Sequence, residues 1–291
     1  MEVDSVLPAD PEASSRRRVD HTRRFRTKAI LIVILAAAGV AGSLLALGMV
    51  SAGCPDPQRS TSCTRILFIG NSYTTVNDLP SVFANLARSG GHRVETGTAA
   101  VDGWSLADHA GSSVTATTLA SKNWDIVVLQ EQSQIPSVEQ FRQDQMYPAA
   151  RRLIGSIRNT GARPLFYLTW ARREGWPENA MPDYASMQAA IDEGYLAIAR
   201  DQRVAVAPVG DGWATLVTHG TGAPLWQQDG SHPSEAGTYL AACVFYATIF
   251  RESPNGLGYH ASLSADAAAI IQSVAAQTVL ADPAKWPPPT E

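Results

Sequence analysis

The stretch "ILFIGNSY", residues 66–73, places four apolar residues directly before Gly70, Asn71 and Ser72. A short apolar run of this kind is typical of a buried strand. Gly, Asn and Ser are typical of tight turns and helix starts, because they tolerate tight backbone geometry or accept hydrogen bonds from free N–H groups. Ser72 is therefore either an ordinary turn residue or a nucleophile presented at the end of a strand, and the local pattern alone favours the turn.

Apolar strand-like segments alternate with helix-length segments along the rest of the chain. The predicted strands cover 65–70, 93–99, 124–130, 164–170 and 204–210, and the predicted helices cover 80–90, 105–121, 138–161, 184–201, 234–251 and 265–281. Apolar strands that are rich in β-branched residues and separated by helical lengths indicate a parallel sheet that is covered on both faces. The sequence therefore predicts an α/β fold.

The N-terminal part of the chain differs in composition from the rest. Residues 1–28 form a basic segment, and residues 29–53 carry no charge. An uncharged helix of that length can cross a hydrocarbon core of about 30 Å. Because the basic flank lies on its N-terminal side, the positive-inside rule places 1–28 in the cytoplasm and the rest of the chain outside. We expect an uncleaved membrane anchor; the alternatives are a cleaved secretory signal and lipidation at Cys54, within "SAGC".

After the anchor, the composition predicts three further parts. Residues 54–63 are rich in Pro and Ser and are predicted to be a linker. Residues 64–282 are predicted to form the folded domain, and the Pro-rich residues 283–291 a disordered tail. Cys54 and Cys63 are close enough in sequence to form a small-loop disulfide if Cys54 is not lipidated, whereas Cys243 lies in an apolar run typical of a buried residue.

Composition and missing motifs argue against several classes of function. The chain has 291 residues, 45% of them hydrophobic, and a formal net charge of −4, which provides no general attraction for nucleic acid. Neither the P-loop nor the dinucleotide-binding glycine motif occurs, and the six histidines never pair at i and i+4. We therefore predict no cofactor, no metal site and no nucleic-acid partner.

A second motif, "DGSHPSEAG", begins at Asp229 and lies just before a predicted helix. Asp229 and His232 are three residues apart, so a carboxylate can approach an imidazole at little entropic cost. A serine needs such an oriented imidazole to act as a nucleophile, because His removes the hydroxyl proton and Asp stabilises the imidazolium. The spacing alone is weak evidence, since Asp and His both occur in ordinary loops and Ser234 could simply cap the helix.

The two motifs together, in this order on an α/β scaffold, resemble the SGNH/GDSL hydrolase superfamily, in the variant group whose first block reads G-N-S. The resemblance extends over about residues 64–252. It implies a three-layer α/β/α sandwich with a central parallel sheet of about five strands. It also implies that Ser72 is the nucleophile, His232 the general base and Asp229 its orienting partner. An α/β-hydrolase is disfavoured, because that fold needs G-x-S-x-G and a well-separated acid and base.

The resemblance also implies an oxyanion hole. Its donors would be the backbone N–H of Ser72, the backbone N–H of Gly103 in "VDGWSLADH", and a side-chain amide after the third strand. Relatives usually carry Asn at the third place, whereas this chain reads "LQEQSQIP". A glutamine amide can donate in the same way. Gln132 is the preferred candidate, and Gln130 and Gln134 are the alternatives.

The sequence thus predicts an exported, membrane-tethered serine esterase that removes short acyl groups, such as O-acetyl groups on carbohydrate, through an acyl-Ser72 intermediate. The alternatives are an O-acyltransferase with the same triad and a catalytically silent polysaccharide-binding domain.

Two further predictions concern other side chains near strand ends. His109 is expected to be a structural histidine. Four tryptophans could form a platform for a sugar ring, although core packing is the more common fate of this residue: Trp104, Trp170, Trp176 and Trp226.

Overall fold

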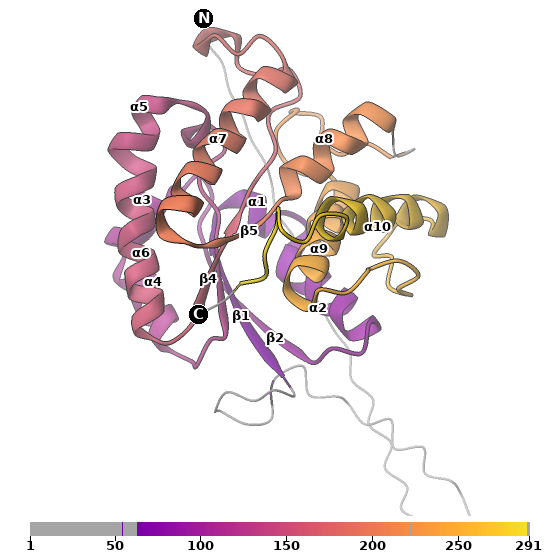
Figure 1. Ribbon diagram of the computed structural model, residues 1–291, viewed down its shortest axis with the longest axis horizontal. Helices are drawn as coiled ribbons and strands as arrows, with labels where there is room; N and C mark the ends of the chain where they lie inside the picture. Colours follow the sequence, from indigo (N-terminus) through magenta and orange to yellow (C-terminus); the bar gives the residue numbers. More distant parts are fainter. Residues whose placement is uncertain (1–53, 55–62, 221–222, 290–291) are drawn as a thin grey trace, which may run out of the picture. The chain divides into compact units, whose positions relative to one another are not determined.

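In the computed structural model, which describes residues 54, 63–220 and 223–289, five parallel strands form one sheet in the order β2-β1-β3-β4-β5 (Figure 1). The strands are β1 (Thr64–Gly70), β2 (Val94–Ala100), β3 (Ile126–Leu129), β4 (Arg163–Tyr167) and β5 (Ala205–Ala207). In sheets with this order, the crevice for ligands forms at the carboxyl ends of the strands, where the strand order reverses. That point lies between β1 and β3, directly beyond Gly70.

Helices cover both faces of the sheet, as the strand pattern predicts (Figure 1). One face carries α2 (Leu79–Ser89), α8 (Val209–His219), α9 (Glu235–Phe250) and α10 (Ala265–Leu280). The other carries α3 (Leu106–Gly111), α4 (Ser113–Ala120), α6 (Tyr147–Asn159) and α7 (Tyr184–Gln202), with the short α5 (Glu139–Phe141) leading through a π-helical turn, η3 (Arg142–Met146), into α6. The predicted three-layer α/β/α architecture is confirmed.

The apolar run that precedes Ser72 supplies both cores. Ile66 and Phe68 belong to the core beneath α2 and α9, and Leu67 and Ile69 belong to the core on the opposite face. Successive side chains of a strand point to opposite faces, so a central strand covered on both sides must be apolar at every position. This is why the run is continuous and does not alternate with polar residues.

Three predicted elements differ from the structure by more than the position of their ends. The predicted helix 105–121 is two helices, because Ser112 interrupts it and caps α4 through its side chain. Helix 138–161 contains the π-helical turn η3. Helix α8 was not predicted: β5 ends at Ala207, Pro208 stands at the N-cap of α8, and the apolar residues assigned to a long strand instead begin that helix.

Residues 283–289 of the C-terminal tail pack against the domain, although the proline content of 283–291 predicts disorder. Trp286 is 2% exposed and packs in the core that contains α6 and α7. Arg251 donates through Nη1 to the Trp286 carbonyl at 2.7 Å, and Arg163 donates to the Pro289 carbonyl at 3.0 Å. One large aromatic side chain with backbone hydrogen bonds thus orders residues 283–289 in spite of their proline content.

The cysteines pair as the sequence analysis allowed. Cys54 and Cys63 form a disulfide with a Cα–Cα distance of 5.6 Å, while Cys243 is free and buried. The predicted membrane segment, 29–53, and the basic segment before it lie outside the described residues. Among residues 54, 63–220 and 223–289, no helix combines the length and the apolar character that a membrane crossing needs.

Candidate active site

The end of β1 places Ser72 at the first position of a short helix, α1 (Ser72–Thr75). Asn71 is the N-cap of α1, and its side-chain oxygen accepts a hydrogen bond from the Tyr73 backbone N–H at 3.1 Å. Its Nδ2 donates to the Trp104 carbonyl at 2.8 Å, which ties this turn to the loop after β2. The Asn71 side chain therefore fixes the direction in which Ser72 leaves the sheet.

The loop before α9 presents the Asp and His of the second motif. Its two arms are held together by backbone hydrogen bonds from Gln227 N–H to the His232 carbonyl and from Ser234 N–H to the Leu225 carbonyl, both 2.8 Å. Ser234 also caps α9, with its side chain accepting from the Gly237 N–H. The same loop therefore both caps α9 through Ser234 and positions His232.

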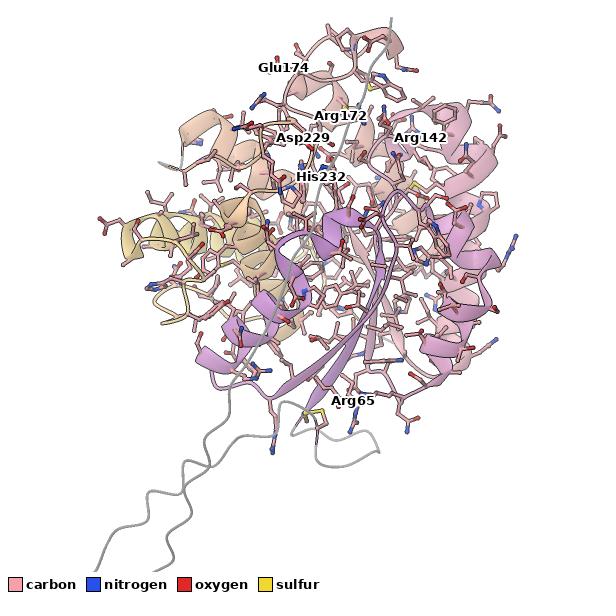
Figure 2. All side chains as sticks on the ribbon, turned by 180° about the vertical axis from the view of Figure 1, so that it is seen from behind. Arg65, Arg142, Arg172, Glu174, Asp229 and His232 are labelled. Carbon is pink, nitrogen blue, oxygen red and sulfur yellow. A yellow bond between two sulfur atoms is a disulfide. The ribbon has the colours of Figure 1, made fainter. Side chains whose placement is uncertain are left out.

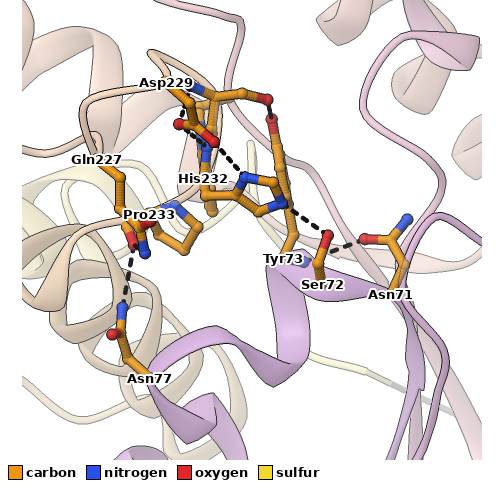
Figure 3. A network of polar contacts seen from close by, with 10 residues as sticks. Asn71, Ser72, Tyr73, Asn77, Gln227, Asp229, His232 and Pro233 are labelled. Carbon is orange, nitrogen blue, oxygen red and sulfur yellow. Dashed lines mark hydrogen bonds and ion pairs between the residues drawn. The ribbon is translucent and has the colours of Figure 1, made fainter. Parts of the chain in front are cut away.

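Ser72, His232 and Asp229 form a continuous hydrogen-bonded chain (Figure 3). His232 Nε2 lies 2.9 Å from Ser72 Oγ, and His232 Nδ1 lies 2.5 Å from Asp229 Oδ2. The other Asp229 oxygen accepts from the backbone N–H groups of Ser231, at 2.9 Å, and His232, at 3.0 Å. The structure therefore brings together the three residues that the two sequence motifs singled out, across 160 positions of sequence.

The surroundings of Asp229 favour its ionised form. Partial burial acts to raise the pKa of Asp229, but the hydrogen bonds from the His232 ring and from the Ser231 and His232 N–H groups outweigh it, so the pKa lies below its usual value. A carboxylate held in this state can orient the imidazole and stabilise positive charge on it.

The Tyr73 ring contacts the ring of His232 and helps to orient it. Its ring stacks on buried Trp170 at a centroid distance of 4.6 Å and meets the His232 ring edge to face at 5.8 Å. The hydroxyl groups of Tyr73 and Ser231 are 2.8 Å apart. Aromatic contacts of this geometry restrict ring orientation, so Tyr73 helps to keep His232 facing Ser72. The sequence did not predict this role for Tyr73, although Tyr73 follows the serine directly.

A cavity of about 370 Å³ opens over Ser72 and His232. Its lining includes Gly103 and Gln132, two of the predicted oxyanion-hole residues. None of the described residues accepts a hydrogen bond from the backbone N–H of Ser72 or of Gly103. Gly103 has φ +77°, in the left-handed region that favours glycine, and it lies in the lining of the cavity.

The three glutamines after β3 have different environments. Gln130 is fully buried: its oxygen accepts from Asn71 N–H and Thr74 Oγ1, and its Nε2 donates to Asn71 Oδ1 and the Glu131 carbonyl. Gln134 is absent from the lining of the cavity. Gln132 lines it, and its oxygen is held by the Gln134 N–H at 2.8 Å while no described acceptor binds its Nε2. Gln132 thus remains the candidate with a donor to offer, and Gln130 is a structural residue.

Glu131 is buried between two loops that border the cavity. Its Oε1 accepts from the Leu106 N–H at 3.0 Å and from the Gln132 N–H at 2.7 Å, whereas its buried Oε2 has no hydrogen-bond partner within the described part of the chain. Burial raises the pKa of Glu131 to about 7, although these two N–H donors act to lower it. Glu131 thus links the loop after Gly103 to Gln132.

The raised pKa of Glu131 predicts that stability falls as the pH rises from about 4.5 to 7. In that window the unfolded chain releases the proton while the folded protein keeps it, so the free energy of unfolding decreases with pH. Relative to Glu131→Gln, whose side chain does not titrate, the wild type should lose about 3 kcal/mol across the window and little more above it. Urea unfolding of both proteins from pH 4 to 8 measures this; a difference independent of pH would contradict the assignment.

Two other predictions concern side chains near strand ends. His109 is structural: it is 2% exposed, with Nε2 2.7 Å from the Gly70 carbonyl and Nδ1 2.9 Å from Thr115 Oγ1, and burial lowers its pKa. None of the four tryptophans proposed as a sugar platform lines the cavity. Trp170 is fully buried and stacks on Trp213 at 3.9 Å. The lining of this cavity therefore gives no support to an aromatic platform. Trp104, Trp170 and Trp226 each pack against another ring of the domain.

A protein from Slackia heliotrinireducens that is assigned to the SGNH hydrolases has a solved structure that is 30% identical to this chain. The alignment covers 63% of this chain and 97% of that one, with a TM-score of 0.53. This chain belongs to the SGNH hydrolases. Family membership makes it a serine ester hydrolase, as the sequence motifs predicted.

Two other solved structures share the SGNH fold at lower identity. A DUF4886 family protein from Bacteroides uniformis is 18% identical, with 75% of this chain and 95% of that chain covered and a TM-score of 0.65. A variant of an acetyl-xylooligosaccharide esterase from Geobacillus Stearmophilus is 14% identical, with 63% and 92% covered and a TM-score of 0.50. No family model and no curated protein sequence matches the chain.

Proposed function

We propose that this SGNH hydrolase is an exported, membrane-tethered esterase that removes short acyl groups, such as O-acetyl groups, from carbohydrate. The observation that carries the proposal is the hydrogen-bonded series Ser72–His232–Asp229 at the mouth of a cavity of about 370 Å³. A serine with a base on one side and free N–H donors on the other has the parts that acyl transfer requires.

In the first half-reaction, Ser72 Oγ attacks the ester carbonyl and His232 Nε2 takes the hydroxyl proton. The carbonyl oxygen becomes negatively charged and is bound by the N–H groups of Ser72 and Gly103 and by the Gln132 amide. Asp229 stabilises the imidazolium through Nδ1. The bond to the leaving alkoxide then breaks, His232 returns the proton to it, and the acyl group stays on Ser72.

In the second half-reaction, water takes the place of the alcohol. His232 removes a proton from water, the hydroxide attacks the acyl-Ser72 carbonyl, and the same donors bind the oxyanion. The Ser72 oxygen leaves with the proton from His232, which releases the carboxylic acid and restores the enzyme.

The size of the cavity and one structural neighbour support the substrate class. A cavity of about 370 Å³ lies near the lower end of the range for ligand sites and suits a short acyl group and part of one sugar ring. One neighbour of the same fold acts on acetylated xylooligosaccharides. We therefore place the ester on a carbohydrate and the short acyl group at Ser72.

Export and tethering are proposed from two features of the N-terminal region. The uncharged segment 29–53 with its basic flank is suited to anchoring the chain. The Cys54–Cys63 disulfide is the kind of bond that persists in an oxidising compartment outside the cytoplasm. With its sulfur in this bond, Cys54 has no thiol free for a lipid, which favours the anchor over lipidation.

The proposal is tested by labelling the full-length protein with a fluorophosphonate probe, which modifies activated serines. The expected result is one labelled peptide containing Ser72, with p-nitrophenyl acetate hydrolysis lost in step with labelling. Ser156→Ala, which changes an exposed serine on α6, should label like the wild type. Folded protein that shows neither labelling nor turnover would contradict the assigned roles and favour a binding domain.

A further inference from the structure

Arg172 lies in the loop after β4 and lines the same cavity as Ser72 and His232. Figure 2 shows it at the end of the sheet where Asp229 and His232 lie, far from Arg65 at the other end. No step of the proposed hydrolysis uses this side chain. Its position beside the reacting serine nevertheless gives its charge a direct influence on what the cavity accepts.

The loop that carries Arg172 is held firmly. The Gln188 side chain accepts from the Ala171 N–H at 2.7 Å, and Trp226 Nε1 donates to the Ala171 carbonyl at 3.1 Å. On the other side, the Arg173 N–H donates to the Gly230 carbonyl at 2.8 Å, within the loop of Asp229 and His232. The backbone around Arg172 is therefore fixed relative to the proposed catalytic base.

Arg172 has no carboxylate partner among the described residues, and its buried Nε has no hydrogen-bond acceptor there. Two other arginines, by contrast, have carboxylate partners: Arg173 lies 3.1 Å from Glu174, and Arg142 contacts Glu139 and Glu193. A guanidinium that is partly withdrawn from water without a counter-charge is costly, unless a ligand supplies the missing partner. Such a guanidinium can bind an anionic ligand and so favour it over a neutral one.

The other charged groups that face the cavity do not neutralise Arg172. Asp102 is an exposed lining residue whose carboxylate accepts from Thr75 Oγ1 at 3.0 Å. Asp229 is directed to His232 and to backbone N–H groups. The remaining polar lining near the serine is neutral and includes Gln132, Ser133 and Ser231. Among the described residues that line the cavity, Arg172 is therefore the one arginine, and there is no lysine.

We propose that Arg172 forms a subsite for a carboxylate of the substrate, so that the enzyme prefers esters that carry an acidic group near the scissile bond. This inference rests on the proposed esterase function and narrows its substrate class. The planar guanidinium offers parallel N–H donors that match the two oxygens of a carboxylate. The carboxylate can belong to the alcohol, as in an O-acylated uronic acid, or to the acyl group, as in the half-ester of a dicarboxylic acid.

The test compares the full-length wild type with Arg172→Gln on two matched substrate pairs. The first pair is methyl glucuronoside and methyl glucoside, each O-acetylated at the same hydroxyl; the second is monoethyl succinate and ethyl butyrate. Arg172→Gln should lower kcat/KM by about 10- to 100-fold for the acidic member of one pair and by less than about 3-fold for both neutral esters. The pair that responds identifies the side of the ester that carries the carboxylate.

Two variants serve as controls. Arg173→Gln removes the same charge one residue away, from an exposed side chain already paired with Glu174, and should leave all four values within about 2-fold. Arg172→Lys keeps the charge without the forked donors and should restore part of the lost preference. Equal effects of Arg172→Gln on the acidic and neutral members of both pairs would overturn the proposal.

A binding measurement separates failure of this inference from failure of the proposed function. Glucuronate and glucose are titrated by NMR into Ser72→Ala and into Ser72→Ala with Arg172→Gln, so that no turnover is needed. Glucuronate should bind at least about 10-fold more weakly to the double variant than to Ser72→Ala, and glucose should bind equally to the two proteins. Succinate takes the place of glucuronate if the succinate–butyrate pair is the one that responds. Absence of any preference for the acids in Ser72→Ala would overturn the subsite even if the enzyme proves to be an active esterase.

Discussion

Replacing Ser72 by Ala is expected to lower kcat for ester hydrolysis by about 10⁴- to 10⁶-fold, and replacing His232 by Ala should cost nearly as much. Ser72 supplies the only atom that forms the acyl intermediate in the proposed mechanism. Without His232, 2.9 Å away, nothing in the cavity is placed to take the Ser72 proton. A small residual rate should persist, because the oxyanion donors still bind the carbonyl oxygen when water attacks directly.

The double variant, Ser72→Ala with His232→Ala, tests whether the two residues act together in catalysis or contribute independently to the rate. Ser72 and His232 act in one proton transfer, so the double variant should be no slower than the worse single variant, within a few-fold. Steady-state kinetics with p-nitrophenyl acetate measure this, with circular dichroism to show that each variant folds. Additive losses, or a Ser72→Ala protein with more than about a tenth of the wild-type rate, would be incompatible with the triad.

Gln130→Leu is expected to lower the free energy of unfolding by about 3 to 5 kcal/mol, since it removes the partners of several buried groups at once. The Asn71 N–H, the Thr74 hydroxyl and the Glu131 carbonyl would all lose a hydrogen bond in a site closed to water. Leu is close to Gln in size, so the effect reports lost hydrogen bonds and only a small change in packing. The space is also tight, since a Cβ built on Gly70 would lie 2.4 Å from Gln130 Oε1.

The same variant should lower kcat by about 100-fold, because Asn71 directs the turn that presents Ser72 and small displacements of a nucleophile are costly. Urea unfolding and kinetics on one preparation measure the two effects together. Gln277→Leu, on the exposed side of α10, is the matched control and should change stability by less than about 0.5 kcal/mol. A loss in Gln130→Leu below about 1 kcal/mol would show that Gln130 does not hold this turn.

The sequence predicted the sheet well because the signal for each strand is local. A central parallel strand needs an apolar residue at every position, and the runs that end at Gly70 and Leu129 meet that requirement. The failures lie where tertiary contacts override composition. Trp286 orders a proline-rich tail by filling a core position, and Pro208 turns the end of an apparent strand into helix α8.

The candidate site shows the same division between local and long-range information. Ser72, Asp229 and His232 could be singled out because each lies in a short motif with a recognisable chemical role. The sequence favoured Gln132 but left Gln130 and Gln134 open, since whether an amide is buried in a hydrogen-bond network or open to a cavity depends on residues such as Asn71, 59 positions from Gln130. Arg172 was missed because no motif marks it, and only the fold brings the loop after β4 to the cavity. Tyr73 stands beside Ser72 in the first motif, but its role depends on contacts with Trp170 and His232, which are distant in sequence.

By itself, the sequence determined the α/β class, the strand that leads to Ser72, and the pairing of an Asp with a His three residues later. These follow from periodicity and turn chemistry, which act over a few neighbouring residues. The tertiary structure alone decided that the imidazole meets the serine hydroxyl, that Gln130 supports the turn while Gln132 lines the cavity, and that Arg172 lies there with no carboxylate partner among the described residues. Those outcomes depend on contacts between residues that are far apart in the sequence and that meet only when the strands pack side by side. A local sequence pattern cannot predict which side chain will bind which partner there.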